Sequence, residues 1–319
     1  MTSSPERAAD VRRHLGLDLG GTNIKVAVVE ERDGAELQVV WRERLPTEGH
    51  RGPEGVVRRL GEIGRSALQR HAGVETVGVG LPGVFHEEAG HAVLLPNLPG
   101  DWNGVPVRDP LAAALGRPVA MVNDARAFSL AEALLGAARG LGTVVCLVLG
   151  TGVGGGIVVD GRLLRGAGEA GEIGHQTVLL GGPRCGCGND GCAEALTRAD
   201  VFARRGGCAT VEEVYAAARD GDATALAAID HAAQWLGVAL ANAYVLLAPD
   251  AFVVGGGIAA AGDLLLEPHQ AAVRRHVFIV PPERIRVLPG TLGPYAGAIG
   301  AALFGREAPG EALNTASMA

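Results

Sequence analysis

A short stretch of the chain concentrates side chains that bind metal ions. Cys185, Cys187 and Cys192 lie in the sequence CGCGNDGC, and His175 precedes them. Three thiolates and one imidazole complete the tetrahedral shell of a zinc ion, and four protein ligands leave no open position for a substrate. We therefore predict a structural zinc site. A redox-active cysteine cluster and inert thiols are the alternatives.

Two glycine turns, each with a threonine, follow apolar segments. They consist of Gly20, Gly21 and Thr22, and of Gly150, Thr151 and Gly152. Glycine lets backbone N–H groups approach a phosphate closely, and the threonine hydroxyl adds a donor. The alternative is a tight β-hairpin, which also favours glycine. Asp18 ends the first segment and is a candidate to hold the magnesium ion of a nucleotide through water.

A third glycine junction, Gly255 to Gly257, follows the apolar segment Ala251 to Val254. Bare backbone at this point suits the approach of an adenosine, and the contacts would come from Gly256 and Gly257. A helix packed tightly on a sheet is the alternative. The full dinucleotide-binding fingerprint is absent from this junction.

Polar residues that suit a sugar occur in several separate places. Asn123 and Asp124 follow the apolar segment PVAMV and precede a helical pattern. Strand ends of α/β sheets are where ligands bind, although a helix N-cap explains the same pair. The remaining candidates are Gly83, Asn97, Glu172, His175 and Glu194. Together these groups would line a pocket for a polyhydroxylated ligand, whereas turn residues and surface carboxylates are the alternative.

The elements that position these residues alternate between strand and helix patterns. The segments 15–30 and 146–161 each have an apolar strand, a glycine turn and a second apolar strand, which indicates an internal duplication. Further strands are expected at 76–80, 119–123 and 251–254, and helices at 53–71, 124–138 and 222–248. This alternation predicts α/β layers.

Length, charge and composition narrow the function. The chain has 319 residues, a formal net charge of −7 and scattered arginines. Two domains fit this length, and no basic stripe marks a nucleic-acid partner. The uncharged segment 143–159 contains GTGVGGG and predicts two buried strands rather than a membrane span. The polar first fourteen residues are not those of a signal peptide, so we expect a cytoplasmic protein with a small-molecule partner and reduced thiols.

The motifs occur in a specific order: DLGGT, the LPG and PN turns, the ND pair, GTGVGGG, GEIGH and CGCGNDGCAE. In this combination the chain, from Leu15 to about Phe304, resembles the ROK family of sugar kinases, repressors and open reading frames. Its closest similarity is to the bacterial glucokinases of that family. The glycine turns alone would indicate only the broader actin-like ATPase clan.

The resemblance implies an α/β fold with two actin-like (ribonuclease H-like) domains flanking a cleft and an inserted structural zinc loop. The N-terminal domain would cover residues 12–123, completed by the C-terminal helix 293–306. The C-terminal domain would cover residues 124–292, with the zinc loop at 171–194.

The resemblance also implies roles for residues that match the family's motifs. Asp124 matches the general base. The implied sugar contacts are Gly83, Asn97, Asn123, Asp124, Glu172, His175 and Glu194. The implied phosphate contacts are Gly20, Gly21, Thr22, Thr151 and Gly152, with Gly256 and Gly257 on the nucleoside side. The implied zinc ligands are His175, Cys185, Cys187 and Cys192.

The implied activity is transfer of the γ-phosphate of ATP, with Mg²⁺, to the 6-hydroxyl of glucose by a homodimer or homotetramer. The alternatives are a kinase for another hexose or an N-acetylhexosamine such as N-acetylmannosamine, and a sugar-sensing repressor. The repressor is disfavoured because about a dozen residues before the first strand are too few for a helix-turn-helix domain. The family usually continues ND with A-N-A, whereas Arg126 is the middle residue here. We expect this cation to tune the choice of sugar.

Overall fold

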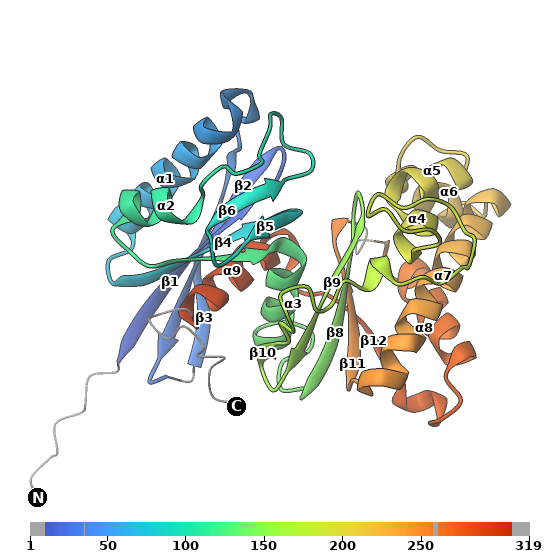
Figure 1. The fold of residues 1–319 in the computed structure, drawn as a ribbon. Coiled ribbons are helices and arrows are strands. Elements are labelled where there is room, and N and C mark those ends of the chain that lie inside the picture. The colour runs from blue at the N-terminus through green and yellow to red at the C-terminus, as the bar shows by residue number, and fades with distance from the viewer. Residues whose placement is uncertain (1–9, 35, 258–260, 308–319) are drawn as a thin grey trace, which may run out of the picture. The chain divides into compact units, whose positions relative to one another are not determined.

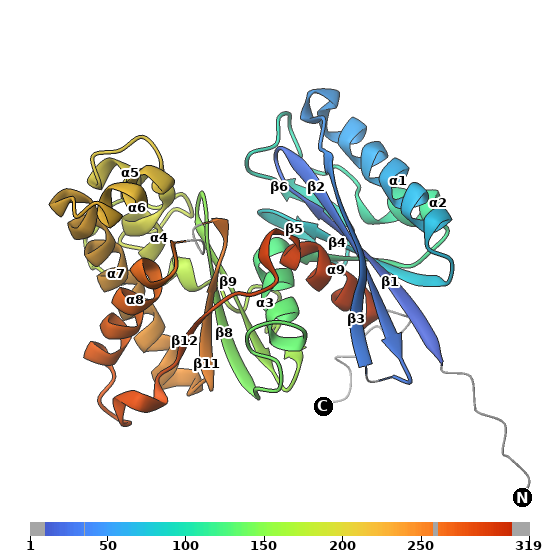
Figure 2. The same ribbon diagram turned by 180° about the vertical axis from the view of Figure 1, so that it is seen from behind.

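The computed structural model describes residues 10–34, 36–257 and 261–307 (Figures 1 and 2). The chain forms two compact units. The first contains the described residues up to Ala127 and those from Tyr295 onward, and the second contains Phe128–Pro294. Among the described residues, no helix is both long enough and apolar enough to span a membrane.

The first unit is built on a five-stranded sheet with the strand order β3-β2-β1-β4-β7. The strands are β1 (Val11–Leu19), β2 (Asn23–Arg32), β3 (Glu36–Pro46), β4 (Val74–Leu81) and β7 (Val119–Asn123). A separate small sheet pairs β5 (Val84–His86) with β6 (His91–Leu94). The helices are α1 (Gly52–Arg70), α2 (Arg108–Leu115), α9 (Ala296–Arg306) and the start of α3 (Asp124–Leu134), with a 3₁₀ turn η1 at Gly49–Arg51.

Alternation along β1 decides which helix covers which face of this sheet. Leu15 and Leu17 are fully buried in the core that includes α1, since residues two apart share one face of a strand. Gly16 points to the opposite face, where a Cβ would come within 1.8 Å of the Ala298 carbonyl oxygen on α9. Glycine is therefore required where α9 crosses the sheet.

The second unit is built on another five-stranded sheet, with the order β10-β9-β8-β11-β12. Its strands are β8 (Thr143–Leu149), β9 (Val153–Val159), β10 (Arg162–Leu163), β11 (Ala251–Gly255) and β12 (Val287–Pro289). Its α-helices are the rest of α3, α4 (Ala193–Thr197), α5 (Ala199–Arg205), α6 (Val211–Arg219), α7 (Ala223–Leu247) and α8 (Asp263–His276). The 3₁₀ turns are η2 (Ile173–His175), η4 (Pro282–Arg284) and η5 (Gly293–Tyr295), the last of which ends in the first unit.

The two sheets have the same strand order and the same strand directions. In each, the first two neighbouring pairs are antiparallel and the last two are parallel. The hairpins expected at 15–30 and 146–161 are β1-β2 and β8-β9, which confirms the predicted strand-turn-strand pattern. Alternation is also repeated: Val145 and Leu147 face the core with α7, whereas Cys146 faces the Ser129 carbonyl on α3.

One helix boundary differs from the sequence-based expectation. The helix expected to reach Ala138 ends at Leu134. The Ala137 N–H donates to Glu132 Oε2 at 2.9 Å, so a side chain replaces the carbonyl four residues back that a longer helix would supply. After Gly257, residues 258–260 lie outside the described part of the chain, and α8 begins at Asp263.

Candidate functional site

Parallel pairing brings three strand ends of the first unit to one edge of its sheet. Asp18 on β1 pairs with Gly80 on β4, and Leu81 on β4 pairs with Asn123 on β7. The carboxyl ends of neighbouring parallel strands meet at the same edge, which is the ligand-binding edge of α/β sheets. The predicted residues Asp18, Asn123 and Asp124 therefore share this edge.

The capping of α3 separates the roles of Asn123 and Asp124. Asn123 Oδ1 accepts hydrogen bonds from the backbone N–H groups of Ala125 at 3.0 Å and Arg126 at 3.3 Å. This is the pattern of an N-cap side chain, and Asp124 is then the first residue of the helix. A carboxylate at this position is favoured by the helix dipole. Asn123 is thus the N-cap and Asp124 the first helical residue, and Asp124 Oδ1 also accepts from the Ala125 N–H at 2.8 Å.

Close backbone contacts place three further predicted residues of the first unit together. A Cβ on Gly21 would come within 2.6 Å of the Asn97 carbonyl oxygen. A Cβ on Gly83 would come within 2.3 Å of the Leu94 carbonyl oxygen, just before Asn97. Asn97 and Gly83 both have positive φ, 65° and 77°, a conformation that Asn tolerates and glycine favours. The predicted phosphate turn and two predicted sugar contacts therefore form one packed group.

The Asp18 side chain is buried and charged, beside the first glycine turn. The Oδ2 atom of Asp18 accepts a hydrogen bond from Lys25 Nζ at 3.0 Å, and Asp18 is 6% exposed to solvent. A buried carboxylate is a suitable oxygen ligand for Mg²⁺ or for its water shell. Within the turn itself, the Gly20 N–H donates to the Asn23 carbonyl at 3.1 Å. The amides left to meet a phosphate are those of Gly21 and Thr22.

The second glycine turn borders a pocket within the second unit. The pocket has a volume of about 640 Å³. Its lining includes Gly150, Thr151 and Gly257 from the glycine turns and Arg198, Asp200 and Glu212 from the segments around α5 and α6. A Cβ on Gly256 would come within 2.1 Å of the Leu149 carbonyl oxygen, so the two glycine turns of this unit are in contact. Sequence reasoning missed the three charged residues because charges on short helices are typical of a solvated surface.

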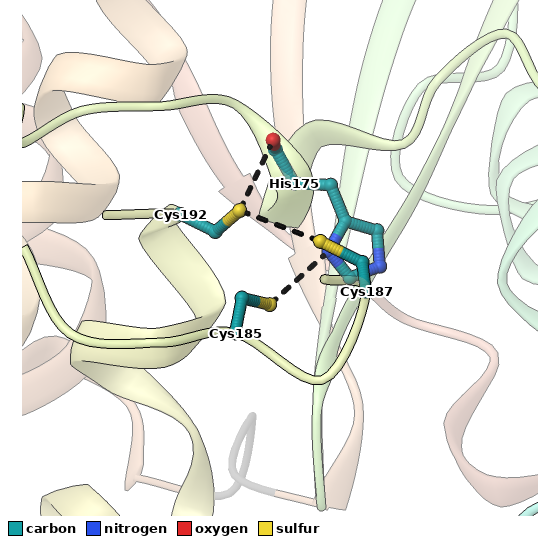
Figure 3. A group of neighbouring side chains, drawn as sticks. All are labelled: His175, Cys185, Cys187 and Cys192. Atoms are coloured by element: carbon teal, nitrogen blue, oxygen red, sulfur yellow. Dashed lines mark hydrogen bonds between the residues drawn. The ribbon is translucent and has the colours of Figure 1, made fainter. Parts of the chain in front are cut away.

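Figure 3 shows His175, Cys185, Cys187 and Cys192 pointing toward one another. Their ligand atoms all lie within 4.8 Å of one another. Cys185 Sγ is 3.6 Å from His175 Nδ1, and Cys187 Sγ is 3.7 Å from Cys192 Sγ. A Zn–S bond of about 2.3 Å gives tetrahedral edges of about 3.8 Å between sulfurs and slightly less to nitrogen. The four residues therefore fit a zinc ion, with the Nδ1 atom of His175 facing it.

The environment of the thiols also fits a cation. Burial raises the pKa of the Cys185 thiol to about 12 and raises the pKa of Cys192. The backbone N–H of Asn189 lowers the pKa of Cys187. Buried thiolates are unfavourable without a positive charge, and a bound metal supplies it. The Asn189 side-chain amide, 3.6 Å from Cys192 Sγ, adds a donor around the ligand shell.

The segment before the cysteines packs on the glycines of β9. A Cβ on Gly155 would come within 2.8 Å of the Gly171 carbonyl oxygen, and a Cβ on Gly174 within 2.1 Å of the Val153 carbonyl oxygen. The glycines of GTGVGGG thus serve two purposes, a turn and a flat surface that admits GEIGH. Glu172 immediately precedes η2, and His175 ends it.

Glu194 connects the cysteine cluster with the second glycine turn. Its Oε2 accepts a hydrogen bond from the Val153 N–H at 2.9 Å, and its Oε1 is 3.7 Å from Cys185 Sγ. A Cβ on Gly152 would come within 2.4 Å of Glu194 Oε2, so glycine is needed there to admit the carboxylate. The structure therefore joins the predicted residues Gly152, Glu194 and Cys185 in one local group.

Comparisons with known proteins place these features in context. The ROK family model matches residues 14–308. A glucokinase of Thermotoga maritima is 37% identical over 315 residues, which cover 92% of this chain and 97% of that protein. Among solved structures, a ROK hexokinase from Thermus thermophilus superposes with a TM-score of 0.79 at 35% identity, covering 92% of this chain and 98% of that one. A ROK family glucokinase from Streptomyces griseus, in complex with glucose and AMPPNP, superposes with a TM-score of 0.77 at 32% identity, covering 93% and 100%.

Proposed function

The chain belongs to the ROK family, and we propose that it is a glucokinase that transfers the γ-phosphate of ATP to the 6-hydroxyl of glucose. The observation that carries the proposal is the start of α3, where Asn123 caps the helix and Asp124, its first residue, places a carboxylate at the ligand-binding edge of the sheet. The similarity to glucokinases over nearly the whole chain supports the same activity.

In the proposed reaction, Asp124 accepts the proton of the 6-hydroxyl as that oxygen attacks the γ-phosphorus and ADP leaves. The proposed sugar contacts are Gly83, Asn97 and Asn123 in the first unit and Glu172, His175 and Glu194 in the second. Because His175 Nδ1 faces the cysteines, the Nε2 atom of its ring is the one that would meet a hydroxyl.

The nucleotide is proposed to use the glycine turns. The amides of Gly21, Thr22, Thr151 and Gly152 would meet phosphate oxygens. The pocket beside Gly150 and Gly257 has room for a nucleoside. Asp18 would hold Mg²⁺ through water, and the ion, when bound, neutralises charge on the phosphates.

Zinc is proposed to be structural. The three cysteines and His175 would fill a four-coordinate shell and leave no position on the ion for a substrate. Its role would be to hold the loop that carries His175 and Glu194. The proposed fold is accordingly two actin-like domains, with the zinc loop as an insertion in the second.

A coupled assay for ADP with a panel of sugars tests the activity. Glucose, mannose, N-acetylglucosamine and N-acetylmannosamine are compared with ATP and Mg²⁺, and kcat/KM is measured for each. We expect glucose to give the highest value. A higher value for an N-acetylhexosamine would reassign the substrate, and absence of ADP formation with every sugar would refute a sugar kinase.

A further inference from the structure

A buried carboxylate that the proposed reaction does not use lies on the far half of α3. Glu132 is fully buried at 0% exposure. Its Oε1 accepts hydrogen bonds from the backbone N–H groups of Thr291 and Leu292, each at 2.9 Å. Its Oε2 accepts from the Ala137 N–H at 2.9 Å and from the Thr291 hydroxyl at 3.3 Å. One side chain therefore holds α3 to a segment distant in sequence.

These two segments are the ones through which the chain passes between its units. α3 passes from the first unit to the second between Ala127 and Phe128, and η5 returns between Pro294 and Tyr295. Glu132 lies about one helical turn beyond Phe128, and its partners Thr291 and Leu292 lie just before Pro294. The hydrogen bonds of Glu132 therefore join the two segments of the second unit that lie next to its boundaries with the first unit.

Further contacts hold the same two segments on either side of the passages. In the second unit, a Cβ on Gly290 would come within 3.0 Å of both Glu132 Oε1 and the Phe128 ring. In the first unit, a Cβ on Gly300 of α9 would come within 1.7 Å of the Ala127 carbonyl oxygen. The stretch between Gly290 and Gly300 includes Gly293, whose φ of 63° lies in the left-handed region that glycine favours.

We propose that Glu132 is a positioning residue for Asp124. Asp124 and Glu132 are on one continuous helix, so a displacement at Glu132 is carried along α3 to its first residue. By fixing α3 to the 290–292 segment, Glu132 holds in place the helix that begins with Asp124. This inference rests on the proposed function, in which Asp124 must meet a hydroxyl next to a γ-phosphate.

The test uses Glu132→Gln with Asp250→Asn as a matched control. Glutamine offers one acceptor oxygen and one NH₂ donor, so at least one backbone N–H would face another donor. Asp250 Oδ2 likewise accepts from two backbone N–H groups of the second unit, Gly142 and Thr143, both at 2.9 Å, but it lies away from the passages. We expect Glu132→Gln to lower kcat about tenfold with glucose KM changed less than about twofold, since small misplacement of a base costs turnover rather than binding. Asp250→Asn should leave kcat unchanged.

Amide hydrogen exchange supplies a readout that does not depend on activity. In Glu132→Gln, exchange should become faster not only at Ala137, Thr291 and Leu292 but also across the passages, at residues 125–127 and 296–300. A purely structural role would confine the change to the second unit and would overturn the proposal, as would an unchanged kcat. Should Glu132→Gln fail to fold, Thr291→Val removes only the hydroxyl and should give the same pattern, more weakly. If the wild type phosphorylates no sugar, the proposed function fails and the exchange pattern alone decides this inference.

Discussion

The two units repeat one sheet topology, yet their corresponding strands carry different chemistry. In both hairpin turns the first glycine N–H closes the turn, Gly20 onto Asn23 at 3.1 Å and Gly150 onto Gly152 at 3.0 Å. The strand before the first turn contains Asp18, whereas β8 contains no charged residue. In the second unit, Glu194 reaches the turn from α4 instead. The carboxylate beside the glycine turn is thus Asp18 of a sheet strand in the first unit and Glu194 of an inserted helix in the second.

The segments that follow β3 in the first unit and β10 in the second differ more than the hairpin turns do. In the first unit, β3 leads through a short turn into α1. In the second, the segment between β10 and α7 contains η2, the cysteine cluster and the helices α4, α5 and α6. The charged lining of the nucleoside-sized pocket comes from this insertion as well. Duplication supplies the glycine turns, and the insertion supplies residues that have no counterpart in the first unit.

The largest expected effect concerns a carboxylate of the first unit. Asp124→Asn should lower kcat by about 10²–10⁴ with far less change in glucose binding, because the proton acceptor is lost while shape and hydrogen bonding remain. Steady-state kinetics and a direct glucose titration measure the two quantities.

The second unit offers the matched control. Asp222 caps α7 by accepting from the Ala225 N–H at 2.8 Å, so Asp222→Asn changes a carboxylate of purely capping geometry. It should leave turnover intact, since asparagine caps about as well as aspartate. If Asp124→Asn is equally silent, Asp124 is structural and the base must be sought at Glu172 or Glu194.

The next effect tests the cysteine and histidine cluster, which among the described residues occurs in the second unit alone. Cys187→Ala should abolish bound zinc and lower the free energy of unfolding by about 3 kcal/mol, because a metal held by the folded loop contributes to folding. Glucose affinity should fall with it, since Glu194 is part of the same local group. Elemental analysis and thermal unfolding measure the outcome. Cys208→Ala, a thiol outside the cluster, serves as the control, and a wild-type protein that is active without zinc would contradict the assignment.

A smaller effect on the pH dependence of stability is expected from the buried histidines His14 in the first unit and His269 in the second. Burial lowers the pKa of His269 in α8 to about 4, and it also lowers the pKa of His14 on β1, where the hydrogen bond to Glu31 opposes the shift. An unfolded histidine has a pKa of about 6.5, so the unfolded chain binds the proton first and stability falls as pH drops from about 6.5 toward 4. His269 should make the second unit about 2 kcal/mol less stable at pH 5 than above pH 7.

Denaturant unfolding of His269→Gln across this pH range measures that contribution. The free energy of unfolding of this variant should fall less between pH 7 and pH 5 than that of the wild type. In the control His86→Gln, where the histidine is exposed, the fall should match that of the wild type. An unchanged slope for His269→Gln would show that other groups cause the acid sensitivity.

The sequence predicted the repeated hairpins because strand, glycine turn and strand are local patterns. It also predicted the cysteine and histidine cluster, since ligand type and close spacing define zinc chemistry in short loops. It did not predict that Asn123 is the N-cap of α3 and Asp124 its first residue, because both residues satisfy the same local preference.

Contacts between distant segments could not be predicted from the sequence, for a different reason. The bonds from Glu132 to Thr291 and Leu292 join residues far apart in the chain, and the lining of the pocket depends on how α5 and α6 pack beside the second glycine turn. A glutamate within a helical pattern indicates a solvated face, and only tertiary packing makes it a buried acceptor.

The smallest expected effect sharpens the comparison within α3 itself. Arg126 follows Asp124 by two positions, where the family pattern has asparagine, and its N–H completes the Asn123 cap. Any residue at this position keeps that backbone bond, so Arg126→Asn should leave the cap of α3 intact. A guanidinium near the proposed sugar contacts would bind hydroxyl oxygens that an amide meets differently. We therefore expect the ratio of kcat/KM for glucose to that for mannose or N-acetylmannosamine to change a few-fold, as one polar contact allows. The same ratio for every sugar in both proteins would mean that Arg126 does not face the substrate, and the choice of hexose would then depend on Asn97, Glu172 and His175.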